Sequence, residues 1–136
     1  MSNKVITFHK IFSISQALQH EFIIPYDIHH ITKIVPFSSD IQQTEDNLCL
    51  IHFDVVGRSD VIQNPRTYIN DTVKQEYSVL LLNNSTAKEI EECESHALLA
   101  KRKFNLNQNS KIKITAYAED GTIAQGTGIT ITLGFY

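Results

Sequence analysis

Two short pairs of histidine and aspartate have the clearest potential for chemistry in this sequence. Asp27 and His29 are two residues apart, and His52 and Asp54 repeat that spacing in reverse order. Residues two apart in a β-strand project to the same face. If the two segments form neighbouring strands, the four side chains offer oxygen and nitrogen ligands for zinc or iron. The alternative is that the four residues are polar side chains on a solvated sheet face.

Other catalytic patterns are absent from the sequence. It has no Gly-x-Ser-x-Gly nucleophile elbow and no glycine-rich loop that leads into a helix to hold a phosphate. Cys49 and Cys93 fall on apolar faces of their predicted elements, where we expect reduced and unreactive thiols. These observations favour a protein that is not an enzyme and needs no cofactor.

Gly126 and Gly128 leave a bare patch on one face of a predicted strand near the end of the chain. Tyr117 belongs to the same face of the preceding strand. A ligand, a side chain or another backbone can approach such a patch, and a bend in the strand is the alternative explanation.

The segment from Ala116 to Gly128, AYAEDGTIAQGTG, resembles the closing hairpin of hotdog-fold thioesterases. In that family a turn precedes a strand with the pattern A-x-G-x-G/T. The resemblance implies a hotdog-like acyl-thioesterase or small-ligand-binding protein as an alternative function.

The bulk properties describe a single small domain without membrane or secretion signals. The chain has 136 residues, a formal net charge of −3 and a pI near 6.0, which argue against a dedicated nucleic-acid-binding protein. No apolar run is long enough to span a bilayer, and the first residues lack the apolar region of a signal peptide. We therefore expect a cytoplasmic protein, or a virion protein if its source is viral.

The abundance of Ile, Thr and Val favours sheet over an all-helical fold. Apolar alternation and turn residues predict a series of short elements. The expected strands are 4–12, 23–36 (strand favoured over helix), 47–57, 75–82, 111–119 and 122–133. A short helix is expected over 14–21, a loop over 38–46 and a long connection over 58–74.

A long helix is predicted over residues 87–104. Thr86 and Glu89 form a capping box, and apolar residues follow at alternating spacings of three and four. Acidic residues gather at its start and basic residues at its end, as the helix dipole favours. The basic residues that could instead contact an anionic partner are Lys101, Arg102, Lys103, Lys111 and Lys113.

The last thirty residues predict a β-hairpin. Asp120 and Gly121 are typical of a two-residue type I′ turn. That turn places Ala118 opposite Ile123, so that the apolar faces of the two strands coincide.

The chain ends in an apolar segment that is either an internal strand or an edge that pairs with a neighbour. The candidate interface residues are Ile129, Ile131, Leu133, Phe135 and Tyr136. Together the elements predict an α+β fold of order β-α-β-β-β-α-β-β. Its mostly antiparallel sheet or open barrel, of about six strands, packs on the helix at 87–104. The preferred function is a structural or assembly module that forms homo-oligomers or docks on other protein subunits, for example in a viral or phage virion. A metal-dependent enzyme that uses the histidine–aspartate pairs is a third alternative.

Overall fold

The computed structural model describes residues 4–44, 50–58, 61, 67–69, 73–75, 79–80, 97–118 and 122–136, and within them every regular element is a strand. The strands are β1 (Val5–Ala17), β2 (Gln19–Ile23), β3 (Ile28–Gln43), β4 (Leu50–Val55), β5 (Thr67–Ile69), β6 (Val73–Gln75), β7 (Val79–Leu80), β8 (Leu98–Leu106), β9 (Lys111–Tyr117) and β10 (Gln125–Phe135). None of the residues that the structure describes belongs to a helix that could cross a lipid bilayer.

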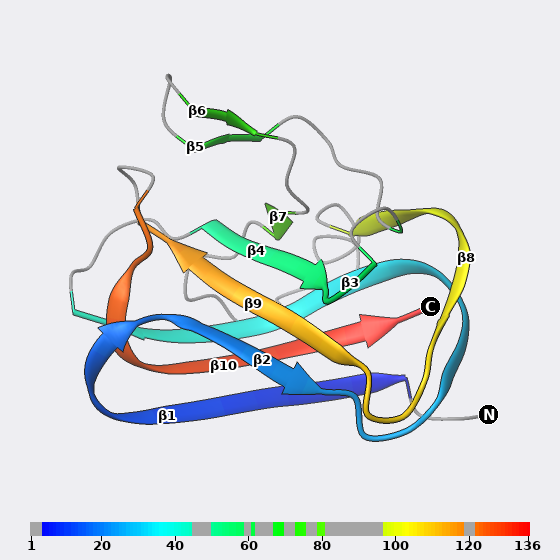
Figure 1. Cartoon of the computed structure of the whole chain (residues 1–136), viewed down its shortest axis with the longest axis horizontal. Helices are drawn as coiled ribbons and strands as arrows, with labels where there is room; N and C mark the ends of the chain where they lie inside the picture. Colours follow the sequence, from blue (N-terminus) through cyan, green and yellow to red (C-terminus); the bar gives the residue numbers. More distant parts are fainter. Residues whose placement is uncertain are drawn as a thin grey trace.

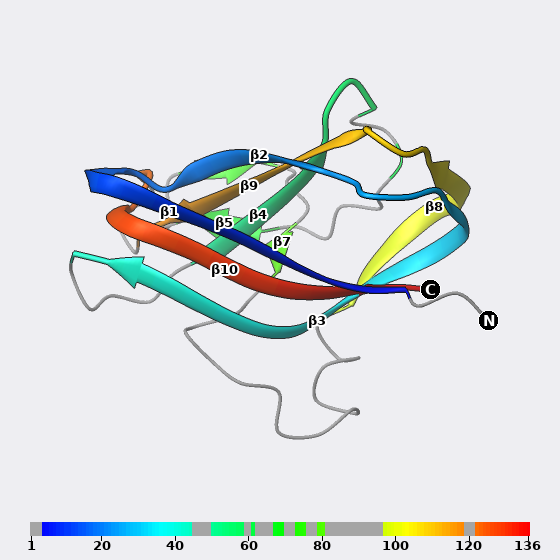
Figure 2. The same ribbon diagram turned by 90° about the horizontal axis from the view of Figure 1, so that it is seen from below.

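Eight of these strands form two four-stranded antiparallel sheets. Sheet A has the order β1-β10-β3-β8, sheet B has the order β2-β9-β4-β7, and β5 and β6 pair only with each other. Figures 1 and 2 show the two sheets as stacked layers, with β10 and β3 in one layer and β2 and β9 in the other. The inward faces of both sheets form one hydrophobic core, which includes Phe53, Ile114, Ile131 and Phe135. The protein is therefore a β-sandwich.

The pairing of the eight sandwich strands is nested. In chain order, the first pairs with the eighth (β1 with β10), the second with the seventh (β2 with β9), the third with the sixth (β3 with β8) and the fourth with the fifth (β4 with β7). Two four-stranded sheets connected in this way form a jelly roll. The nesting places the first and last strands side by side in sheet A, with β1 at the edge and β10 inside it.

The predicted α+β fold is wrong, because the long packing helix over 87–104 is not present. Residues 98–106 form strand β8, while 81–96 lie outside the described residues. Leu98, Phe104 and Leu106 are buried and pair with β3, whereas the residues between Leu98 and Phe104 are exposed or half-buried. Pairing with a distant strand has overridden the helical spacing of this segment.

The short helix expected over 14–21 is also wrong. These residues end β1 and begin β2, with Leu18 fully buried between the two strands. The polar segment 38–46 was expected to be a loop, but β3 continues to Gln43. β3 pairs with β10 along this stretch, where Asp40 and Gln42 are exposed while Ser39 is buried opposite Ile131.

The hairpin register is wrong as well, although both of its strands exist. β9 belongs to sheet B and β10 to sheet A, and within the described residues the two segments are joined by one bridge, in which Tyr117 rather than Ala118 lies opposite Ile123. The apolar faces of β9 and β10 do coincide, but they do so across the core of the sandwich. The turn at Asp120 and Gly121 lies outside the described residues.

Several strand predictions are confirmed. β1, β3 and β4 lie in the segments 4–12, 23–36 and 47–57, although β1 and β3 continue beyond them. In the ambiguous 23–36 segment, residues 28–36 are strand as favoured, whereas Ile23 ends β2 and residues 24–27 are not strand. β7 lies in the 75–82 segment, but at the edge of sheet B. The sandwich also lacks the helix that a hotdog sheet wraps, within the residues described, so the resemblance at Ala116–Gly128 does not extend to the fold.

Candidate interaction surfaces

The structure does not bring the four predicted metal ligands together. Asp27 and His29 lie at the start of β3 in sheet A, and His52 and Asp54 lie on β4 in sheet B. Asp27 Oδ1 accepts a hydrogen bond from the Gln108 backbone N–H at 2.6 Å. All four residues are described, and no group of three or more His, Cys, Asp or Glu in the described part of the chain could hold a metal. Cys49 and Cys93 lie outside that part.

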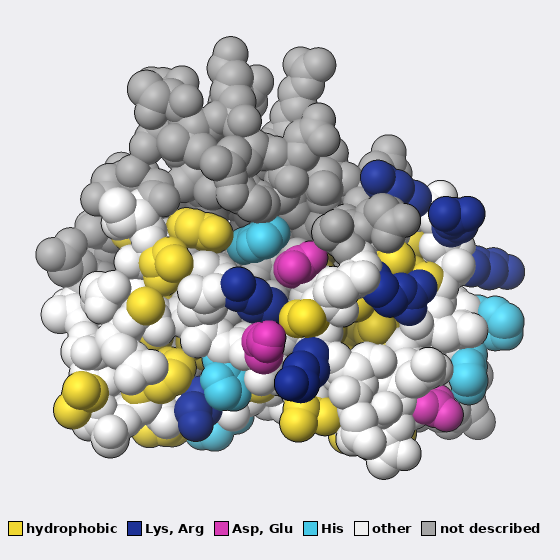
Figure 3. All heavy atoms as spheres, viewed as in Figure 1, with side chains coloured by type: hydrophobic (Ala, Val, Ile, Leu, Met, Phe, Trp, Pro, Cys, Tyr) yellow, Lys and Arg dark blue, Asp and Glu magenta, His cyan; other side chains and the backbone are white. Residues whose placement is uncertain are grey.

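His52 is half-buried on the outer face of sheet B, beside Tyr117, with ring centroids 6.2 Å apart. Burial lowers the pKa of His52 from its ordinary value, Asp54 acts to raise it, and Lys113 acts to lower it. Lys113 lies opposite Glu21 on one side and Asp54 on the other. Figure 3 shows these charges intermixed over β2, β9 and β4, so this face presents no field of a single sign.

The glycine patch is filled by the protein itself. A Cβ atom at Gly126 would lie 2.0 Å from the Gln42 carbonyl oxygen, and one at Gly128 would lie 3.2 Å from Gln42 Cγ and 3.3 Å from Ile11 Cδ1. Of the alternatives open at the sequence level, the approach of another backbone and its side chain explains the glycines. Tyr117 lies apart from them, in sheet B.

The apolar end of the chain is the internal strand β10, which lies between β1 and β3. Ile129, Ile131, Leu133 and Phe135 are fully buried. These four side chains therefore face the core and are not available to a partner. Tyr136 alone of the five candidate interface residues remains exposed, at 39%.

The outer face of sheet A carries paired polar side chains. Thr7 Oγ1 and Thr132 Oγ1 lie 2.9 Å apart, and His9 Nδ1 lies 2.7 Å from Thr130 Oγ1. A histidine beside a hydroxyl can activate a nucleophile only where donors also stabilise the oxyanion. The backbone of β10 is committed to ladders with both β1 and β3, so it does not supply those donors. We interpret these contacts as cross-strand pairs that stabilise the sheet.

The two edges of sheet A differ in chemistry. β1 exposes Ile11 by 58% and Ile14 by 70%, next to an irregularity where five steps along β1 match two along β10. β8 has a similar irregularity, in which two steps along β3 match five along β8, but its extra residues include Lys101, Arg102 and Lys103. All three basic side chains are exposed. Bulges and charges protect a sheet edge against pairing, so β8 is protected more strongly than β1.

The edges β1 and β2 lie on the same side of the sandwich, where the rings of Phe8 and Phe22 approach to 5.5 Å. We call this the β1–β2 side. It includes four of the seven large hydrophobic side chains that are exposed among the described residues: Val5, Ile11, Ile14 and Ile23. Sequence patterns could not find them, because exposed and buried isoleucines look alike until the strand order is known.

Comparison with known proteins does not suggest a function, so the function has to be argued from these surfaces. No family model, no curated protein and no solved structure matches this chain. Jelly rolls occur in viral capsids, lectins and cupins, so the strand order alone does not select a function.

Proposed function

We propose that the protein is a non-enzymatic assembly module in which copies of the chain associate through the β1–β2 side. The observation that carries the proposal is the concentration of exposed apolar side chains there, led by Ile14 at 70% and Ile11 at 58% exposure. Large apolar side chains that are exposed together on one side of a protein are typical of interaction sites.

A second copy is the partner that this side fits best. β1 is the less protected edge of sheet A, and such an edge can pair antiparallel with the same strand of another copy about a two-fold axis, which extends the sheet. The side carries charges of opposite sign, Lys10 and Glu21, so that two copies do not confront each other with a single sign. Association of this kind is what a jelly-roll subunit of a larger assembly needs, for example in the shell of a viral or phage particle.

The test compares matched substitutions at the two edges of sheet A. We expect Ile11→Lys with Ile14→Lys to convert an oligomer to a monomer, because each substitution places a charge in the apolar contact. Leu99→Lys on β8 is the control, since Leu99 is exposed by 53% at the protected edge. Light scattering after size-exclusion chromatography, over a range of protein concentrations, gives the mass.

The Leu99→Lys variant should form an oligomer of the same mass as the wild-type protein. A wild-type chain that stays monomeric at every concentration would contradict the proposal. Equal loss of assembly in the Leu99→Lys variant would show that the β1–β2 side has no special role.

A further inference from the structure

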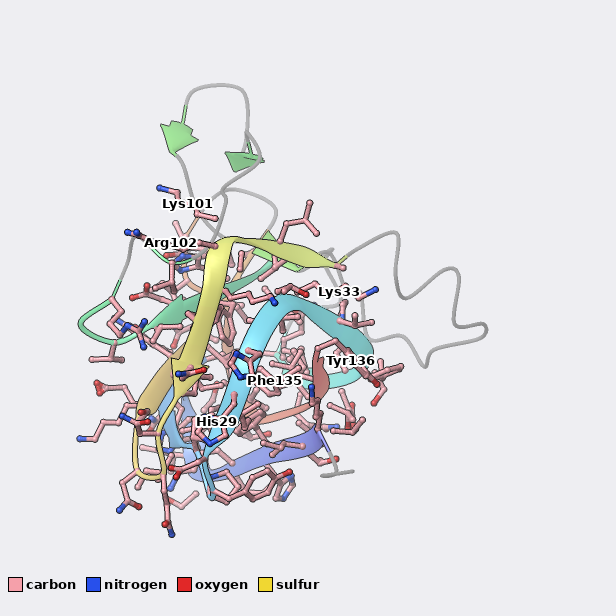
Figure 4. All side chains as sticks on the ribbon, turned by 90° about the vertical axis from the view of Figure 1, so that its right-hand side faces the viewer. His29, Lys33, Lys101, Arg102, Phe135 and Tyr136 are labelled. Atoms are coloured by element: carbon pink, nitrogen blue, oxygen red, sulfur yellow. The ribbon has the colours of Figure 1, made fainter. Side chains whose placement is uncertain are left out.

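The strongest feature that assembly does not explain is a concentration of basic residues on the β8 edge. Lys101, Arg102 and Lys103 are consecutive and exposed, in the stretch where β8 departs from regular pairing with β3. Figure 4 shows Lys101 and Arg102 on β8, and Lys33 and His29 on β3, on the side of the molecule that these two strands form. We call this the β8 side.

Arg58, in the turn after β4, is fixed next to these residues. Its Nη1 donates to the Asn105 carbonyl oxygen at 2.7 Å, and its guanidinium lies 5.6 Å from the ring centroid of Phe104. The His30 backbone N–H donates to the Asn105 side-chain oxygen at 2.8 Å. A guanidinium has five N–H donors, so Arg58 can keep this bond and still bind a phosphate.

The β8 side is locally basic. Among the described residues, Lys101, Arg102 and Lys103 on β8, Lys33 on β3 and Arg58 after β4 contribute five positive charges here, and Asp27 contributes one negative charge. The expectation of no dedicated nucleic-acid binding was drawn from the net charge of −3 over the whole chain, and a net charge does not describe how charges are distributed over a surface.

Two simpler explanations account for less of what is observed. Compensation of a helix dipole fails, because residues 98–106 form a strand. Protection of a sheet edge explains a bulge with charge on it, but it does not explain why Arg58 and His30 are both held at Asn105 beside that bulge. Asp27, near the far end of β8, accepts a hydrogen bond from Gln108 and marks where the basic surface ends.

We propose that the β8 side binds the phosphate backbone of nucleic acid. Phe104 is buried beneath Arg58 and is not available to stack on a base, so contacts to phosphates dominate and binding is independent of sequence. The proposal is independent of assembly through the β1–β2 side, which lies at the other edge of sheet A.

The experiment measures binding by fluorescence anisotropy of a labelled mixed-sequence DNA duplex and, separately, a labelled single-stranded RNA, over a series of salt concentrations. Lys101→Gln with Arg102→Gln should weaken binding to the duplex about tenfold or more at low salt. It should also reduce the slope of log K against log salt by about 2, one for each phosphate contact that is lost. The matched control, Lys111→Gln with Lys113→Gln, removes the same charge from β9 in sheet B, outside the β8 side, and should leave the slope unchanged.

Both pairs of substitutions are at exposed or half-buried positions, and the thermal unfolding of each variant confirms that it folds. Binding of the RNA or the duplex identifies which form of the backbone is preferred, and either result supports the site. The proposal is overturned if neither probe binds at low salt, or if the control pair weakens binding as much as the β8 pair. Competition by polyglutamate as strong as competition by nucleic acid would also overturn it, since the surface would then bind any polyanion.

Discussion

At the scale of single residues, His52 couples the folded state to pH. Burial is the largest cause of its lowered pKa, with Asp54 opposing and Lys113 reinforcing the shift. The folded protein therefore holds this imidazole neutral at a pH where the unfolded chain, with the ordinary value of 6.5, begins to bind a proton. The contribution of His52 to the free energy of unfolding is therefore present in full above pH 6.5. It is lost as the pH falls from 6.5 toward the lower pKa of His52 in the folded state.

We expect the free energy of unfolding of the wild-type protein to decrease as the pH falls below 6.5. His52→Gln, which does not titrate, should make this decrease smaller. His20, whose pKa burial and then Lys10 lower while Glu21 raises it, should supply the part that remains. Urea unfolding at a series of pH values measures the effect. An identical pH dependence in the wild type and the variant would assign the titration to other groups.

At the scale of elements, alternation of apolar residues predicted which faces are buried but not which strands pair. In the segment 111–119, the alternation puts Ile112, Ile114 and Ala116 on one face, and all three are buried. The partner of that strand could not be found in the same way. An apolar face can pack across the core of a sandwich, or it can continue the apolar face of a hairpin neighbour in the same sheet, and the sequence pattern is the same in both cases.

The helix predicted over 87–104 failed for a related reason. Lys, Arg, Ala and Leu favour a helix locally, and the three–four spacing of its apolar residues supports one. The same residues also suit an edge strand with a bulge, in which Leu98, Phe104 and Leu106 face the core. Pairing with β3, whose partner residues lie more than sixty positions earlier in the chain, selects the strand over the helix, and a local sequence pattern contains no information about that pairing.

The candidate surfaces could not be predicted from the sequence for a similar reason, because they depend on which strands form the edges of the sheets.

The contact of β10 with β3 gives a test of strand spacing. A Cβ atom at Gly126 would lie 2.0 Å from a backbone oxygen of Gln42, which can yield only if the two strands separate. We expect Gly126→Ala to lower the free energy of unfolding by about 1–3 kcal/mol or more, the range typical of overpacking. Gly128→Ala is the matched control, because its nearest atoms, Gln42 Cγ at 3.2 Å and Ile11 Cδ1 at 3.3 Å, belong to side chains and not to the backbone. Chemical denaturation of both variants compares them, and an equal effect would show that the backbone contact is not limiting.

At the scale of the whole molecule, the nested strand order makes the fold depend on its last strand. β10 pairs with β1 on one side, where Val5 lies opposite Gly134, and with β3 on the other. Without it, both neighbours lose a ladder and sheet A is split. Each buried side chain of β10 adds about 1.5–3 kcal/mol from burial, and the total stability of a typical domain is only about 5–15 kcal/mol. The core is therefore incomplete without the last strand.

We therefore expect a chain that lacks Ile129–Tyr136 to lose its cooperative thermal transition. The deletion removes four fully buried side chains at once, those of Ile129, Ile131, Leu133 and Phe135. Leu133→Ala should keep the transition but lower the free energy of unfolding by about 2–5 kcal/mol, since it creates one cavity in an otherwise intact sheet. Circular dichroism during heating follows both variants. If the shortened chain unfolded cooperatively at the wild-type midpoint, the segment would be dispensable, and an interface role for it would again be open. A loss of folding would instead show that the apolar end of the sequence completes the core of the sandwich and is not free to bind a partner.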